Sequence, residues 1–378
     1  MERVLIKELG TVSTGNTPSK SDAKFYESED IGFVKPDIIS DSEITYVTST
    51  NEYISENARL KARIVGPDSV FVTCIGSIGK IGIAKEKEYA FNQQINAIEP
   101  NDRVLPEYLA YCLFFNRKKL ADIANAPVVP IINKTQFENF AVNISEDIKE
   151  QRKIVRILDK ANEIILERKQ QLKQLDILIK SRFVEMFGDM ENPDCKWDKM
   201  KLVDTCIEPD DIKCGPFGTQ LNKDEYMDSG VAVWEIPQIN LAFNAKPMHY
   251  LTQNKAEQLK AYSIIPGDIA MSRKGNVGKC AVFPDEYEEG IIHSDVLRIR
   301  VDGSRVNPVF MMRQLHYSGA VQHQIDLVSS GAIMAGINVT KLKQIFVHIP
   351  PIELQNQFAD FVQQTNKSKL QIQKVAYA

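Results

Sequence analysis

The sequence predicts two similar α+β domains joined by two long helices, which pair as an antiparallel coiled coil with pseudo-two-fold symmetry. Two observations predict this fold class: the halves of the chain match in order, and each half is followed by a segment with the apolar spacing of a coiled coil. At 378 residues the chain also exceeds the usual size of one domain. We expect the domains at 1–146 and 189–349 and the helices at 147–188 and 350–378.

The internal repeat consists of short segments that recur in the same order about 200 residues apart. Each match is weak, but their common order makes coincidence improbable and indicates a duplicated domain. The matched pairs are IVGPD from Ile64 and IIPGD from Ile264, GSIGK from Gly76 and GNVGK from Gly275, FNQQINAIEP from Phe91 and IHSDVLRIRV from Ile292, PEYLAYCLF from Pro106 and PVFMMRQLH from Pro308, and NKTQFENFAVNI from Asn133 and NVTKLKQIFVHI from Asn338.

Within each domain, β-branched runs alternate with glycine turns, a pattern typical of strands. We expect strands at 69–73, 82–84 and 296–301, and short helices that begin at Pro106 and Pro308. The two Gly-x-x-Gly stretches then lie in tight turns between strands. The first is no phosphate-binding loop, because Cys74 replaces its first glycine and Ile81 replaces the Ser or Thr after the lysine.

The first long helix has no proline or glycine from Asp147 to Phe187, so it can run about 40 residues, or about 60 Å. The second is shorter, about 25 residues. A lone helix would leave its apolar stripe in water, so we predict that the two pair; the alternative is that each packs flat on its own domain. The predicted pairing residues are Ile154, Leu158, Ala161, Ile165, Leu172, Leu175 and Ile179 in the first helix, and Leu354, Phe358, Phe361, Ile372 and Val375 in the second.

The overall composition does not by itself indicate nucleic-acid binding. The formal charge is -4, so contact with DNA has to depend on local basic patches or on a basic partner. The six cysteines and five histidines lack the spacing of a disulfide framework or a metal site. The N-terminus is charged and no apolar run is long enough to span a bilayer, so we expect a soluble, cytoplasmic protein with reduced thiols.

The order of these features resembles the specificity subunits of type I restriction-modification systems. The resemblance covers essentially the whole chain and is carried by Gly-Asp before a strand, the Gly-x-x-Gly turn, and Pro350-Pro351 before the last helix. Its most characteristic stretch is SGAIMAGINVTKLKQIFVHIPPIELQNQF, from Ser330. The first copy departs from the pattern, because Ser145-Glu146 stands where the double proline is expected.

The resemblance implies that each domain reads one half of a split, asymmetric target in double-stranded DNA. It implies that the paired helices set the distance between the halves and carry two methyltransferase subunits, and it allows for restriction subunits in the same complex. By the same resemblance this chain is not an enzyme and holds no cofactor, whereas S-adenosylmethionine, ATP and magnesium belong to the partner subunits.

The candidate DNA-binding residues lie in turns and at strand ends. Arg and Lys pair with guanine and Asn with adenine, while small hydroxyls approach phosphate. Ordinary solvated turns and strand ends are the alternative interpretation. The candidates are Thr17, Ser19, Lys20, Lys35, Ser77, Lys80, Asn92 and Gln93 in the first copy, and Lys213, Gln220, Gln238, Asn240, Arg273, Lys274, Asn276, Lys279, His293 and Ser294 in the second.

Two other functional classes fit less well. An amino-methyltransferase would carry Asn or Asp before a Pro-Pro, but Ile349 precedes the double proline here, and Pro284-Asp285-Glu286 lacks the rest of a nuclease motif. A coiled-coil scaffold that binds only other proteins remains open, since the helix flanks carry mixed charge.

Overall fold

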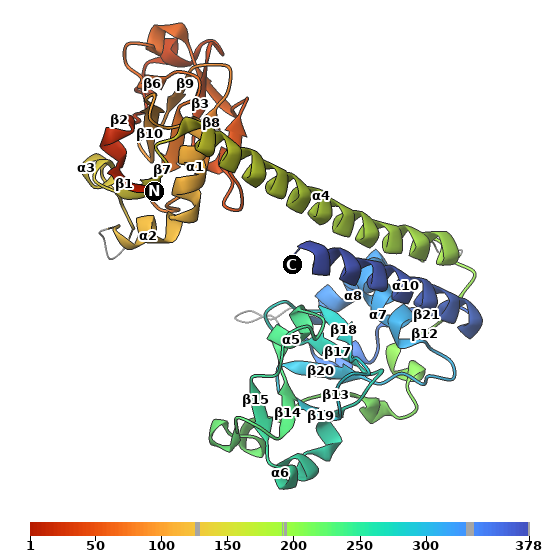
Figure 1. The fold of residues 1–378 in the computed structure, drawn as a ribbon. Coiled ribbons are helices and arrows are strands. Elements are labelled where there is room, and N and C mark those ends of the chain that lie inside the picture. Colours follow the sequence, from red (N-terminus) through yellow and green to blue (C-terminus); the bar gives the residue numbers. More distant parts are fainter. Residues whose placement is uncertain (125–128, 191, 193–194, 330–335, 377–378) are drawn as a thin grey trace. The chain divides into compact units, whose positions relative to one another are not determined.

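The computed structural model describes residues 1–124, 129–190, 192, 195–329 and 336–376 (Figure 1). It forms two compact units, Met1–Ile165 and Leu166–Ala378, whose boundary falls inside the longest helix, α4 (Ile148–Phe187). The first six residues of the stretch from Ser330 lie outside the described residues. Within the described part of the chain, no helix is both long and apolar enough to cross a membrane.

The first repeat contains eleven of the described strands and three of the described α-helices ahead of α4. They are β1 (Glu2–Leu5), β2 (Gly10–Thr14), β3 (Ile31–Val34), β4 (Thr45–Val47), β5 (Glu52–Ile54), β6 (Ile64–Val65), β7 (Val70–Thr73), β8 (Ile81–Ala84), β9 (Tyr89–Phe91), β10 (Ile95–Pro100), α1 (Pro106–Phe115), α2 (Arg117–Asp122), α3 (Lys134–Glu138) and β11 (Ala141–Ile144).

The second repeat follows α4 and has a matching set of elements. They are β12 (Asp198–Lys201), β13 (Ile212–Cys214), β14 (Val231–Trp234), α5 (Ile236–Asn240), β15 (His249–Leu251), α6 (Gln253–Gln258), β16 (Ser263–Ile264), β17 (Ile269–Ser272), β18 (Cys280–Val282), β19 (Gly290–Ile292), β20 (Val296–Ile299), α7 (Pro308–Tyr317), α8 (Gly319–Ser329), α9 (Val339–Leu342), β21 (Phe346–Ile349) and α10 (Ile352–Ala376).

The sheet topology confirms the duplication. The first repeat has sheets ordered β1-β11, β2-β10-β7-β8-β4 and β5-β3-β9-β6, and the second has β12-β21, β13-β20-β17-β18 and β15-β14-β19-β16. In the third sheet of each repeat one pair is parallel, β3 with β9 or β14 with β19, and the other pairs are antiparallel. The five-stranded sheet of the first repeat also carries an edge strand, β4, that runs parallel to β8. Apart from β4, the strand order and direction of the first repeat recur in the second, so the two α+β domains share one fold.

The cores form where the sheets meet the helices that begin at the predicted prolines. Leu109 and Leu113 of α1 are fully buried against β7 and β8, and Met311 and Leu315 of α7 occupy the matching positions in the second repeat. Proline opens both helices, at a position whose N–H needs no partner within the helix. Burying each such side chain contributes about 1.5–3 kcal/mol.

A buried glutamine fixes the first turn of each long helix to its own domain. The Gln151 side chain accepts from Leu105 N–H (2.8 Å) and donates to the carbonyls of Arg103 (2.8 Å) and Ser145 (2.7 Å). Gln355 repeats this pattern with Asn307 N–H (2.8 Å) and the carbonyls of Arg305 and Pro350 (3.1 and 2.6 Å). Both glutamines are fully buried, so each satisfies three backbone groups that water cannot reach.

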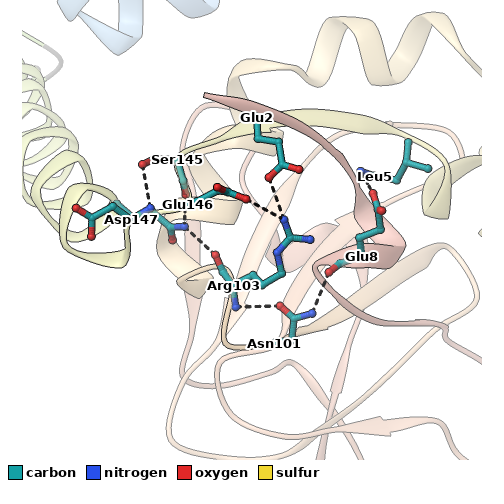
Figure 2. Close-up of polar contacts among 9 residues, drawn as sticks. Glu2, Leu5, Glu8, Asn101, Arg103, Ser145, Glu146 and Asp147 are labelled. Carbon is teal, nitrogen blue, oxygen red and sulfur yellow. Dashed lines mark hydrogen bonds and ion pairs between the residues drawn. The ribbon is translucent and has the colours of Figure 1, made fainter.

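The side chains around the first glutamine differ from those around the second. Arg103 lies beside Glu2 (3.0 Å) and Glu146 (3.6 Å), as Figure 2 shows. The neighbouring Glu146 carboxyl raises the pKa of Glu2. In the second repeat, Arg305 instead donates to the Asp204 carbonyl (3.4 Å). The glutamine contacts are therefore common to both repeats, whereas the surface ion pairs are not.

Helix α10 packs against the C-terminal part of α4 in antiparallel orientation. Phe183 and Phe187 of α4 contact Phe358 of α10, with ring centroids 5.5 Å apart in both pairs, and Asp176 pairs with Lys369. The residue numbers thus rise on one helix as they fall on the other, as an antiparallel coiled coil requires. Phe310 of α7 joins the same apolar cluster, which ties both helices to the second domain.

The predicted pairing residues divide along α4. Ile179 is fully buried and packs with Leu354, Phe358 and Phe361, as predicted, while Leu172, Leu175 and Ile372 are half-buried. The prediction is wrong for Ile154 and Leu158, which pack on the core of the first domain because the glutamine contact holds the first turns of α4 there. Ala161 and Ile165 are exposed, and the Val375 side chain lies outside the described residues.

Candidate nucleic-acid interface

In the first repeat, the chain after β2 lies directly against the end of β9. A Cβ atom on Gly15 would come within 2.2 Å of Asn92 O and 2.4 Å of Phe91 O, so only glycine allows this approach. The N–H of Asn16 donates to Phe91 O at 3.0 Å, and the Thr17 hydroxyl donates to Gln93 Oε1 at 2.8 Å. The loop is therefore held in a fixed position beside the strand end.

This loop forms one side of a hollow of about 750 Å³. Six of the eight candidates from the first copy line it, although they come from three separate parts of the sequence. They are Thr17, Ser19, Lys20, Lys35, Asn92 and Gln93, joined by Pro18, Pro36, Asp37 and Gln94.

The polar groups of this hollow are engaged to different degrees. Lys35 forms an ion pair with Glu52. The Asn92 side chain donates through Nδ2 to Gln94 Oε1 and accepts through Oδ1 from the Gln94 backbone N–H. Lys20 is exposed and forms no ion pair with any residue that the structure describes. Lys20 is thus the cation best placed to meet an anion from solution, and the amides of Gln93 and Gln94 lie next to it in the hollow.

The Gly-x-x-Gly turns are built alike in the two repeats. Gly76 and Gly79 have φ of +75° and +84°, and Gly275 and Gly278 have +68° and +79°, values that favour glycine. Each turn connects two antiparallel strands, β7 to β8 and β17 to β18, as predicted.

The side chains of the first turn are less available than predicted. Ser77 is exposed at the tip, but Lys80 is mostly buried, because its ammonium donates to Pro36 O (3.4 Å) and lies 3.4 Å from Asp41. Lys80 is therefore engaged in contacts within the domain, and its contact with DNA stays a prediction.

The second repeat keeps the same close approach of loop to strand. A Cβ atom on Gly215 would lie 2.3 Å from His293 O and 2.4 Å from Ile292 O, matching Gly15. Arg273 lies over the Phe217 ring at 4.9 Å and donates to Ile337 O at 3.2 Å. Phe217 itself is 47% exposed, so an aromatic face and a guanidinium lie together at the surface.

The other candidates near this turn are partly engaged. Lys274 pairs with Asp295 at 2.9 Å, and His293 Nδ1 accepts from the Asp295 N–H at 3.3 Å. Asn276 is exposed at the tip of the turn, and Ser294 is half-buried.

The remaining candidates of the second repeat are spread over its surface and core. Lys213 pairs with Asp210 (3.2 Å), and Gln220 is exposed and accepts from the Tyr262 hydroxyl (3.0 Å). Asn240 and Lys279 line a different hollow, of about 420 Å³, between α7 and α10. Of the candidates among the described residues of the second repeat, only Asn240 and Lys279 line this hollow.

Gln238 is a correction to the prediction. It is 1% exposed, its side chain accepts from Glu235 N–H at 3.2 Å, and it donates to Lys246 O at 3.1 Å. The amide therefore closes the turn at the start of α5 and is not available to DNA. Phe217 was not among the predicted residues, although it lies between the candidates Lys213 and Gln220 in the sequence.

The described residues contain no group of three His, Cys, Asp or Glu side chains that could hold a metal ion. Burial raises the pKa of the Cys74 thiol to about 12 and that of Cys206 to about 11, which keeps both thiols protonated. His316 is the most strongly shifted histidine: burial, with Arg313 and Lys279 nearby, lowers its pKa to about 4.

Comparison with protein families identifies the first part of the chain. Residues 1–176 match the family described as "Type I restriction modification DNA specificity domain". The second repeat has the same strand order and the same glutamine anchor as this matched part. This family model thus covers the first repeat and most of α4, and the chain is similar to the specificity subunits of type I restriction-modification systems.

Curated relatives of this family match about half of the chain. The HindI specificity subunit of Haemophilus influenzae is 29% identical over 187 residues, which are 47% of this chain and 40% of the relative. The MjaIX specificity subunit of Methanocaldococcus jannaschii is 29% identical over 191 residues, 49% of this chain and 43% of the relative. The aligned parts thus span about two-fifths of the length of each of these two relatives.

Solved structures of the family share the fold over nearly the whole chain. A type I system S subunit from M. genitalium matches with a TM-score of 0.57 at 12% identity, covering 100% of this chain and 92% of that one. A chain from a study of complex assembly and conformational transition of the type I system matches with a TM-score of 0.52 at 15% identity, covering 99% and 95%. At these identities the likeness supports the architecture and not individual contacts.

Proposed function

We propose that this chain is the DNA-recognition subunit of a type I restriction-modification complex, with each repeat reading one half of a bipartite, asymmetric target. The observation that carries the proposal is the hollow of the first repeat, where Lys20, Gln93 and four other candidates meet. Fixed backbone loops with short polar side chains and the exposed Lys20 suit contact with base edges and phosphate together.

The helices supply the second part of the proposal. Helix α4 has 40 residues, about 60 Å of regular structure, and a helix of fixed length can set the separation between two half-sites. Its surface carries exposed apolar side chains, including Ile157 (59%), Ile177 (55%) and Val184 (51%). Exposed apolar side chains favour coverage by a partner, and we propose two methyltransferase subunits there, with restriction subunits joining the complex.

The reaction then belongs to the partners. In this proposal S-adenosylmethionine, ATP and magnesium bind in the methyltransferase and restriction subunits, and this chain contributes position and sequence choice. A protein-binding scaffold without DNA contact is the rival function, and the exposed helix surface alone would suit it equally.

A methyl-transfer assay distinguishes the DNA-recognition function from an enzyme and from a protein-binding scaffold. We expect no transfer from S-adenosylmethionine to DNA by the purified chain, and methylation of adenine in a two-part site when a methyltransferase subunit is added. Activity of the chain alone would make it an enzyme in its own right. A complex whose methylation sites are the same with and without this chain would support the scaffold.

The spacing role has its own test. Deleting one heptad from α4 and the paired heptad from α10 shortens the helix pair by about 10 Å, or about three base pairs. Mapping methylated sites should show a shorter gap between two unchanged half-sequences. An unchanged gap would contradict the role of the helices as a ruler.

A further inference from the structure

Strand β11 of the first repeat has one edge that faces away from its partner strand β1. The N–H of Ile6 donates to Phe140 O at 2.9 Å, and the register continues from this pair to Ala141 and Asn143. Along an antiparallel ladder, residue pairs that exchange backbone hydrogen bonds alternate with pairs that do not. The backbone N–H and C=O groups of Ala141 and Asn143 therefore point away from β1.

The second repeat closes the matching edge with two side-chain amides. Phe346 and His348 occupy the same places in the register of β12 and β21. Gln324 accepts from Phe346 N–H (2.8 Å) and donates to its carbonyl (3.1 Å), and Gln314 does the same for His348 at 2.7 Å in both bonds. Each glutamine thus imitates one residue of an added strand.

The first repeat lacks this closure. Cys112 stands at the position of Gln314, each being the seventh residue of a helix that begins with proline. Its thiol reaches only the Asn143 carbonyl, at 3.8 Å. Within the part of the chain that the structure describes, no side chain accepts a hydrogen bond from the backbone N–H groups of Ala141 and Asn143. In β21, Gln324 and Gln314 accept from the matching N–H groups.

A hollow of about 840 Å³ lies at this edge, lined by Ala141 and Asn143 themselves, by the α1–α2 corner and by α3. The charged residues among its lining are Arg3 and Lys119, both exposed cations. Neither forms an ion pair with another described residue. The edge therefore offers unpaired backbone groups beside uncompensated positive charge.

We propose that the first repeat binds an extended acidic peptide segment of a partner protein, which adds to β11 as a further strand. Main-chain bonds to Ala141 and Asn143 would hold the peptide, since an open strand edge is a template for another strand. Arg3 and Lys119 select acidic side chains. The site is separate from the candidate nucleic-acid hollow, and the proposal does not depend on DNA reading.

Fluorescence anisotropy of a labelled ten-residue peptide, with glutamate alternating with valine and threonine, tests the proposal on the full chain. We expect saturable binding that is lost when proline replaces every third residue, because proline cannot donate to a ladder. A peptide with lysine in place of glutamate should bind at least tenfold more weakly.

Variants locate the binding. Cys112→Gln copies the closure of the second repeat and should weaken peptide binding at least tenfold, whereas the matched change Gln314→Ala should leave it within twofold. The double variant Arg3→Glu, Lys119→Glu should reverse the preference between the glutamate and lysine peptides without burying any new group. Circular dichroism and the melting temperature confirm that each variant is folded.

Failure of the acidic peptide to bind the wild-type chain at millimolar concentration would overturn the proposal, as would unchanged binding by folded Cys112→Gln. Dimerisation of the wild-type chain that Cys112→Gln abolishes, seen by sedimentation, would assign the edge to a second copy and also overturn it. Bipartite methylation by the complex is measured in parallel, so a defect in DNA reading is recognised separately.

Discussion

The two repeats are most alike where a domain meets its long helix and least alike at the surfaces that face solvent. Gln151 and Gln355 form the same three hydrogen bonds to the same backbone positions, even though Ser145 stands in the first repeat where Pro350 stands in the second. By contrast, six candidate DNA contacts line one hollow of the first repeat, whereas two candidates among the described residues, Asn240 and Lys279, line the hollow between α7 and α10 of the second. A duplicated domain that keeps its anchor while its surface changes can present two different reading surfaces on one architecture.

The largest effect is expected at the glutamine anchors. Gln151→Ala and Gln355→Ala each leave an N–H and two carbonyls without their partner, so each should lower the free energy of unfolding of its own unit by roughly 3–5 kcal/mol. Chemical unfolding of the full chain, followed separately in each unit, measures this.

Gln151→Glu is the matched control, because it keeps an acceptor for Leu105 N–H but cannot donate to either carbonyl. A loss at least as large as that of Gln151→Ala is expected, because a buried carboxylate oxygen would face the two carbonyl oxygens. If the alanine change left the free energy of unfolding of one unit unchanged, the two glutamine anchors would not be equivalent.

A smaller effect is expected in the pH dependence of stability, which should differ between the two repeats. His316 accepts from Cys280 N–H at 3.1 Å, and its pKa is lowered from 6.5 to about 4. As pH falls, the imidazole of His316 is protonated in the unfolded chain before it is protonated in the folded chain. The contribution of neutral His316 to the free energy of unfolding is therefore complete above pH 6.5 and is lost as pH falls toward 4. The loss is on the order of 3 kcal/mol. Phe114 holds the matching place in α1.

The second unit should therefore lose more stability than the first between pH 7 and pH 5, as thermal unfolding at the two pH values would show. His316→Gln removes the titrating group but retains an acceptor for Cys280 N–H. An unaltered pH dependence in this variant would assign the acid sensitivity to other groups.

The smallest effect concerns two lysines of the first repeat, and it rests on the proposed function. Lys20→Ala removes an exposed cation and should reduce the salt dependence of DNA binding by about one ion and the affinity by about 1 kcal/mol. Lys80→Ala removes a cation that already contacts Pro36 O and Asp41, and should change stability more than the salt slope. Titration with target DNA at several salt concentrations distinguishes them, and equal slopes for both variants would contradict the assignment.

Local patterns in the sequence were enough to predict the duplication, the glycine turns, the proline-initiated helices and the long α4. These features depend on short-range chemistry, such as φ above zero at Gly76 or the absence of proline over 40 residues. The pairing residues were predicted correctly only where α4 meets α10. Periodicity shows that Ile154 and Ile179 share a stripe, but it does not say which neighbour covers each part of it.

By itself, the sequence determined the repeated architecture and the residue types available for DNA contact. Tertiary structure decided their availability: it gathered Lys20 and Gln93 from separate loops, buried Gln238 inside a turn, and left β11 open where β21 is closed. The physical reason is that exposure and hydrogen-bond partners depend on groups far apart in the chain, and the side chain at 112 or 314 acts only through the strand edge that folding brings beside it.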